Sequence, residues 1–123
     1  MKTFLSVASV LVLLLGAAWL FLPETMLARW AVETDATGLY LGRRYGASLF
    51  GYAVMLWLAA RLADSGGRSA ILVGGALVAG LLALVSLAGV VMGIVGPGAW
   101  ASVAIEAVLA AGFVYLLLAR RAP

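Results

Sequence analysis

The sequence contains neither cysteine nor histidine among its 123 residues. The missing cysteines exclude disulfide bonds, thiol redox chemistry and thiolate metal sites. The missing histidines exclude imidazole ligation of haem or zinc, and they exclude acid–base catalysis by an imidazole. We therefore expect a non-catalytic protein that holds no metal and no cofactor.

Charge is scarce as well, because 11% of the residues are charged and 66% are hydrophobic. A soluble domain of this length has too little interior to hide so much apolar surface, so the composition indicates a membrane protein. The net charge of +3 is carried at the ends of apolar runs. Charge placed there indicates topology and contact with lipid headgroups rather than nucleic-acid binding. We expect the lipid bilayer as a partner and no nucleic acid.

Four apolar stretches have about the 20 residues that a membrane-crossing helix needs. They cover residues 3–22, 39–62, 69–95 and 99–119. Because the links between them are short, we predict a single all-α domain over residues 1–123, with four transmembrane helices in an antiparallel up-down-up-down bundle. The first stretch begins like a signal peptide, but it is long and lacks an A-x-A cleavage site, so we expect it to be retained.

A short amphipathic helix is predicted after the first span, over residues 24–33. As a helix, this segment places Met26, Leu27 and Trp30 on one face, which suits a position at the membrane interface. An irregular loop is the alternative. Interfacial anchoring is expected of three aromatic side chains, because Trp and Tyr favour headgroup level: Trp30, Trp100 and Tyr115. Helix-capping residues are available before the second span at Thr34, Asp35 and Thr37.

Basic residues predict the orientation in the membrane. With alternating spans, one side of the bundle carries five of them and the other carries three: Lys2, Arg61, Arg68, Arg120 and Arg121 against Arg29, Arg43 and Arg44. Because cytoplasmic loops carry the excess of Lys and Arg, we predict that both termini are cytoplasmic.

Small residues form a stripe at helical spacing along the third span. Stripes of this kind let the backbones of neighbouring membrane helices approach closely. We predict a helix-packing surface here, rather than a pore lining, made by Gly75, Ala79, Ser86, Gly89 and Gly93.

Glu106 lies inside the apolar stretch 99–119. A carboxylate at this depth costs about 2.5–3.5 kcal/mol and is rarely kept without a partner or a task. Arg43 and Arg44 near the start of the second span are the available partners. The helical pattern directs Leu41, Tyr45, Leu49, Tyr52 and Leu56 toward lipid and Arg43 toward the bundle interior, with Arg44 at its edge.

Ser102 shares the helical side of Glu106, so we predict a buried Arg43–Glu106 pair in the outer half of the bundle, with Arg44 and Ser102 beside it. The pair could be a structural ion pair, because removing one partner would strand the other charge. It could equally bind a ligand, with the Arg43 guanidinium donating to a carboxylate, phosphate or quinone-like oxygen. The sequence leaves both interpretations open.

Residues 42–61 read GRRYGASLFGYAVMLWLAAR, with a glycine three residues after Arg43 and Trp-Leu-Ala-Ala-Arg at the end. Together with the preceding Phe-Leu-Pro-Glu and the glutamate in the last span, this string resembles the DoxX-like small bacterial four-helix membrane proteins. The resemblance implies a bacterial cytoplasmic membrane and the character of an accessory subunit. The named member is linked to a thiosulfate:quinone oxidoreductase, but no residue of this chain carries that redox chemistry.

We therefore expect a non-catalytic accessory subunit of a membrane complex, or a binder of a small lipophilic or anionic molecule, that works with a membrane protein partner or as a homo-oligomer. One alternative is an oligomeric proton-coupled transporter or channel that uses Glu106. The small multidrug transporters carry their membrane glutamate in the first helix, and residues 3–22 contain no carboxylate. A second alternative is the membrane subunit of a quinone-linked oxidoreductase.

Overall fold

The computed structural model describes residues 1–62 and 66–120, and every regular element in these ranges is helical. The long helices are α1 (Lys2–Phe21), α3 (Ala36–Arg61), α4 (Gly66–Val91) and α5 (Trp100–Ala119), and the short ones are α2 (Pro23–Arg29) and η1 (Pro97–Ala99). The prediction of an all-α protein is confirmed. Three segments of the described chain are long and apolar enough to cross a bilayer, which indicates a membrane protein: Lys2–Phe21, Gly66–Val91 and Pro97–Ala119.

The helix ends follow from local capping. Asp35 is the N-cap of α3, and its carboxylate accepts a hydrogen bond of 2.6 Å from the Gly38 N–H. The segment after α1 is helical over Pro23–Arg29 only, which is shorter than the predicted residues 24–33. Proline at the first position of α2 has no N–H to leave unpaired there.

α4 ends at Val91, four residues before the predicted end at Val95. Gly93 has a φ of +70°, its N–H donates to the Val90 carbonyl, and the Ile94 N–H donates to the Gly89 carbonyl. This pair of bonds around a left-handed glycine is a Schellman motif, which stops the helix. The expected role of Gly93 in helix packing is therefore corrected: this exposed residue shapes the turn that follows α4.

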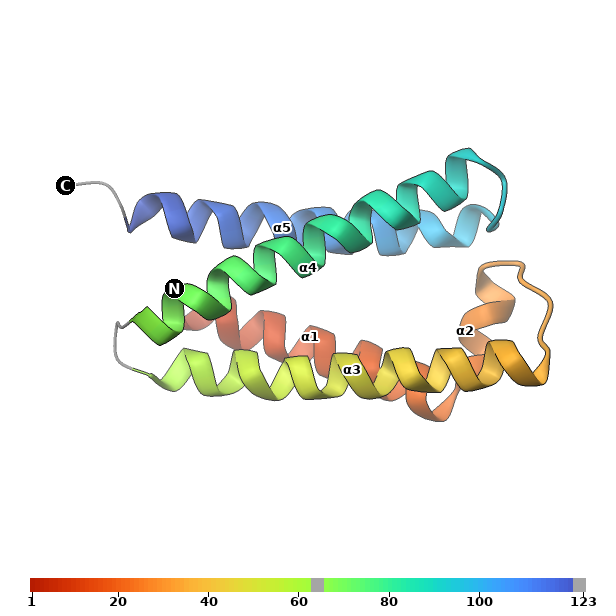
Figure 1. Cartoon of the computed structure of the whole chain (residues 1–123), viewed down its shortest axis with the longest axis horizontal. Helices are drawn as coiled ribbons and strands as arrows, with labels where there is room; N and C mark the ends of the chain where they lie inside the picture. The colour runs from red at the N-terminus through yellow and green to blue at the C-terminus, as the bar shows by residue number, and fades with distance from the viewer. Residues whose placement is uncertain (63–65, 121–123) are drawn as a thin grey trace.

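The four long helices form two closely packed pairs, α1 with α3 and α4 with α5 (Figure 1). Glycines allow the first pair to approach, because a Cβ at Gly46 would lie 2.8 Å from the Gly16 carbonyl oxygen and 2.5 Å from the Leu20 nitrogen. Further along the same contact, the Ser9 hydroxyl donates a 2.9 Å hydrogen bond to the Ala53 carbonyl. α3 touches α4 over a much shorter stretch than it touches α1.

The two pairs join through a core at the end of the molecule that holds the N-terminus. Each long helix contributes one fully buried large side chain there, namely Leu5, Leu56, Leu72 and Phe113. Phe4 packs edge-on against Phe113 at 5.3 Å between ring centroids. Because lipid is as apolar as a protein interior, these side chains stabilise this end of a membrane protein mainly through close packing between the helices.

At the opposite end, the segment that contains α2 reaches the turn between α4 and α5 (Figure 1). The Gly96 N–H donates a 2.6 Å hydrogen bond to the Trp30 carbonyl oxygen. A Cβ at Gly98 would overlap the carbonyl oxygen of Arg29, so the close contact requires glycine at this position. The two helix pairs are thus held together at this end by backbone contacts rather than by a core.

Candidate functional site

Glu106 is buried on α5, with 8% of its surface exposed. The Ser86 hydroxyl on α4 donates a 2.8 Å hydrogen bond to Glu106 Oε2. Among residues 1–62 and 66–120, this is the hydrogen bond that the carboxylate receives, and no ion pair accompanies it. Sequence analysis placed Ser86 in a packing stripe, whereas the structure makes it the partner of the buried carboxylate.

Arg43 does not reach Glu106, because its side chain is exposed on α3. α3 turns its glycine-containing side, with Gly42 and Gly46, toward α1, and buries Leu49 and Leu56 in the interior. The predicted lipid-facing side of this helix is therefore its packing side, and the expected Arg43–Glu106 pair is replaced by Ser86–Glu106. The physical reason for this orientation of α3 is its close contact with α1 through Gly42 and Gly46. This contact leaves the Arg43 and Arg44 side chains on the surface of the protein, where their charges are solvated or contact headgroups.

Arg44 is exposed as well, and it donates a 3.2 Å hydrogen bond to the Tyr40 hydroxyl one turn earlier on the same helix. Its guanidinium also lies 5.8 Å from the centre of the Tyr40 ring. Ser102 is half-buried on α5 and makes no hydrogen bond with the part of the chain that the structure describes. The cluster expected around Glu106 therefore retains the glutamate alone.

A cavity of about 600 Å³ opens beside Glu106, and we call it the Glu106 cavity. It lies between the two helix pairs at the α2 end, and its walls are almost entirely apolar. Three aromatic rings form one side: Trp19 contacts Trp30 at 4.9 Å and Tyr45 at 5.5 Å between centroids, both edge-to-face. The remaining wall comes largely from α4 and the turn after it, through Leu82, Val85, Ser86, Gly89, Met92 and Val95.

Nearly the whole chain matches a known family model. A family model described as a domain of unknown function (DUF8292) matches residues 1–118. The chain belongs to the DUF8292 family. No curated protein and no solved structure shows a significant match to it.

The predicted packing stripe of the DUF8292 chain divides into two parts. Gly75 and Ala79 are buried, and a Cβ at Gly75 would lie 2.6 Å from the Tyr52 hydroxyl and 2.9 Å from the Phe113 ring. Ser86 and Gly89 instead line the Glu106 cavity. One end of the stripe is therefore buried against neighbouring helices, and the other end forms a cavity wall.

The three aromatic residues expected as interfacial anchors differ in their surroundings. Trp30 is half-buried against Trp19 and forms part of the cavity wall. Trp100 is 49% exposed at the start of α5, and Tyr115 is 70% exposed near its end. Trp100 and Tyr115 are free to meet headgroups, whereas Trp30 has an additional role as a cavity residue.

Arg68 is the residue that sequence analysis missed most clearly, because it counted only as a topological charge. It is buried with 4% exposure, and its Nε donates a 3.1 Å hydrogen bond to the Ala59 carbonyl at the end of α3. Its Nη2 donates to the Leu62 carbonyl. A basic side chain commonly satisfies the last carbonyls of a helix in this way. Its position in the first turn of α4, close in sequence to the end of α3 at Arg61, is the signal that could have indicated this contact.

Proposed function

We propose that this protein spans the bilayer four times in an up-down-up-down arrangement, with both termini in the bacterial cytoplasm. The three apolar spans have mean hydropathies of 2.4, 2.5 and 2.1. The fourth span is α3, which is 26 residues long and packs along α1 for much of its length. Its arginines, tyrosines and glycines lower its hydropathy without shortening it. The excess of Lys and Arg at the terminal end supports the orientation.

The protein binds a small lipophilic molecule in the Glu106 cavity. The observation that carries this proposal is the Ser86–Glu106 pair, a buried polar pair in the wall of a largely apolar cavity of about 600 Å³. Ligand sites typically measure about 300–1,000 Å³ and combine apolar walls with a few placed polar groups. A cavity that opens between membrane-spanning helices takes ligands from the bilayer.

The chemistry of the cavity narrows the ligand class. A carboxylate accepts hydrogen bonds, so it favours a hydroxyl or a protonated amine and repels an anion. Arg43 is exposed outside the cavity, and none of the described residues that line the cavity is a cation that could compensate for an anionic ligand. Of the two classes expected from the sequence, the lipophilic one is therefore favoured. A quinol or another lipophilic alcohol has the required donor beside an apolar body, and the aromatic wall at Trp19 offers a surface on which a ring can pack.

An accessory role follows from this assignment. A protein that holds a lipophilic molecule without catalytic groups supplies it to, or takes it from, another membrane protein. The partner protein, or a second copy of the chain, stays a prediction, and so does the resemblance to DoxX-like proteins.

The test is identification of the bound molecule. We would purify the full chain in mild detergent and analyse the extracted small molecules by mass spectrometry, comparing the wild type with two variants. Glu106→Gln keeps the shape but weakens the acceptor, and Ala88→Trp fills the exposed mouth of the cavity. A lipophilic alcohol or amine should co-purify with the wild type and be lost about tenfold or more from both variants, since one charge-assisted hydrogen bond contributes about 1.5–3 kcal/mol.

Ser102→Ala provides the matched control, because Ser102 lies one turn from Glu106 on the same helix and is outside the cavity lining. It should retain the molecule at the wild-type level. Equal retention by the wild type, Glu106→Gln and Ala88→Trp would show that the cavity is not a ligand site.

A further inference from the structure

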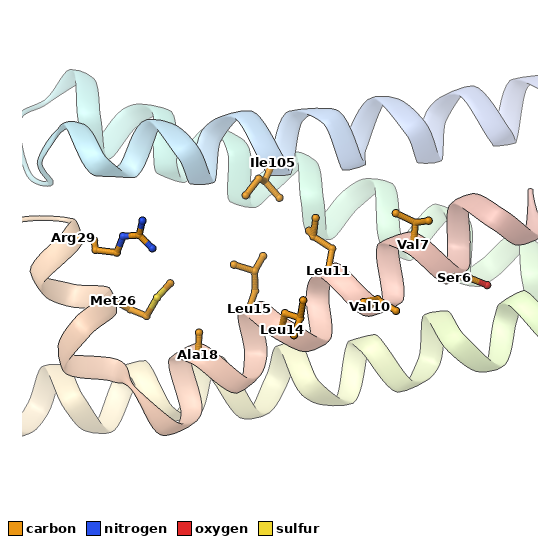
Figure 2. Close-up of a pocket in the computed structure, with 10 residues that line it drawn as sticks. All are labelled: Ser6, Val7, Val10, Leu11, Leu14, Leu15, Ala18, Met26, Arg29 and Ile105. Atoms are coloured by element: carbon orange, nitrogen blue, oxygen red, sulfur yellow. The ribbon is translucent and has the colours of Figure 1, made fainter.

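A second cavity, of about 670 Å³, lies along α1, and it plays no part in the proposed function. Its lining is apolar over the length of the helix, from Val7 to Ala18, and it is closed on one side by Ile105 of α5 (Figure 2). We call it the α1 groove. Met26 and Arg29 of α2 form its end, and Figure 2 shows the Arg29 side chain directed into the space between α2 and α5.

α2 separates this groove from the Glu106 cavity. Met26 and Arg29 line the α1 groove, whereas Leu27 and the adjoining Trp30 line the Glu106 cavity. The segment from Met26 to Trp30 thus presents a cationic side chain, Arg29, to the α1 groove and an aromatic side chain, Trp30, to the Glu106 cavity. The two cavities are both lined mainly by apolar residues, but the α1 groove is bordered by the cationic Arg29 and the other cavity by Glu106.

Arg29 is exposed, and its guanidinium makes no hydrogen bond or ion pair with any described residue. It lies where α1 ends at Phe21 and α5 begins at Trp100, which is the boundary of the apolar spans. Headgroup phosphates lie at this level of a bilayer. A guanidinium presents several donors in a plane and binds phosphate oxygens through two parallel hydrogen bonds.

The groove has the length of one leaflet. Eleven helical steps separate Val7 from Ala18, and at 1.5 Å each they cover roughly 16 Å. Half of a hydrocarbon core about 30 Å thick is roughly 15 Å. An acyl chain that begins at the level of Arg29 therefore lies against α1 down to the bilayer midplane and beyond.

We propose that the α1 groove is a site for an anionic phospholipid, with its phosphate on Arg29 and an acyl chain along α1. The charge at the end of the groove makes the site selective, because an apolar groove alone accepts the chain of any lipid. Free phosphate shares the headgroup chemistry but lacks the chain, so it does not occupy the site.

The test measures lipid retention by native mass spectrometry of the full chain in detergent, with phosphatidylglycerol and phosphatidylcholine of identical acyl chains. The wild type should retain phosphatidylglycerol about fivefold better, the ratio that one basic residue near a membrane surface supplies. Arg29→Gln should abolish this preference, and Leu14→Trp, which fills the groove, should reduce retention of both lipids.

Arg43→Gln is the matched control, because Arg43 is an exposed arginine of the same end of the molecule and lies outside the groove. It should keep the preference for phosphatidylglycerol. Equal losses in Arg29→Gln and Arg43→Gln would show only a general surface-charge effect and overturn the site. Inorganic phosphate that displaces phosphatidylglycerol at an equal concentration would overturn the role of the acyl chain. Neither outcome affects the proposal that the Glu106 cavity binds a lipophilic molecule, because that proposal is tested separately with Glu106→Gln.

Discussion

Ser86 and Glu106 are joined by a 2.8 Å hydrogen bond between two helices that meet at the Gly96-Pro97-Gly98 turn. The bond gives the buried carboxyl group a hydrogen-bond donor, and no basic side chain among the described residues pairs with it. The register of α4 against α5, rather than the composition of either helix, creates the pair.

Ser86→Ala should destabilise the fold by about 1–2 kcal/mol, since it removes the hydrogen bond to a buried carboxylate. The free energy of unfolding in a mixed-micelle denaturant titration measures the change. Ser102→Ala is the control, and it should stay within about 0.5 kcal/mol of the wild type. Comparable losses in the two variants would contradict the assignment of Ser86 as the partner of Glu106.

Gly46→Ala should weaken the α1–α3 pair by about 1–3 kcal/mol, because the added methyl group would meet the Gly16 carbonyl and the Leu20 backbone. Gly51→Ala on the same helix meets no atom within 4 Å. It should be neutral or slightly stabilising, since alanine is the better helix former. The measurement is the thermal unfolding temperature of both variants in the same detergent. Equal unfolding temperatures would contradict a close contact between α1 and α3 at Gly46.

Arg68→Met should cost about 1–3 kcal/mol, because it leaves the Ala59 and Leu62 carbonyls without their side-chain donor. Arg43→Met should change the unfolding free energy by less than about 0.5 kcal/mol, since this side chain is exposed. Denaturant unfolding compares them directly. A larger loss of unfolding free energy in Arg43→Met than in Arg68→Met would contradict the exposed position of Arg43 and favour the Arg43–Glu106 pair that the sequence predicted.

Gly93→Ala should destabilise the protein by about 1–2 kcal/mol, because the residue has a φ of +70° that a side chain disfavours. Gly80→Ala within α4 is the comparison, since its Cβ would have open space around it. Thermal melting should show the loss only in Gly93→Ala. If Gly80→Ala were the more harmful substitution, the turn would not depend on the left-handed glycine.

The positions of the helices could be predicted from the sequence because hydropathy and turn residues are local signals. The inward side of α3 could not. In a membrane protein both lipid and protein interior accept apolar side chains, so the positions of Leu49 and Leu56 do not reveal the packing side. The informative residues were Gly42 and Gly46, which bring α3 against α1.

Glu106 was identified correctly as a buried carboxylate, but its partner was not. The partner depends on where α4 stops, and the helix ends at Val91 because Gly93 adopts a left-handed conformation. Three glycines between residues 93 and 98 gave no indication of which one would end the helix. Arg68 was missed for a related reason, since its partners are backbone carbonyls near the end of α3, which the sequence around Arg68 does not indicate.

The link between α2 and the α4–α5 turn uses the Gly96 N–H, the Trp30 carbonyl and the space left by Gly98, and none of these is a side-chain function. Natural variation could therefore alter residues 29 and 30, and with them the contents of both cavities, while the architecture between them stays the same. The positions that this link constrains most are Gly96 and Gly98, and neither of them lines the Glu106 cavity or the α1 groove.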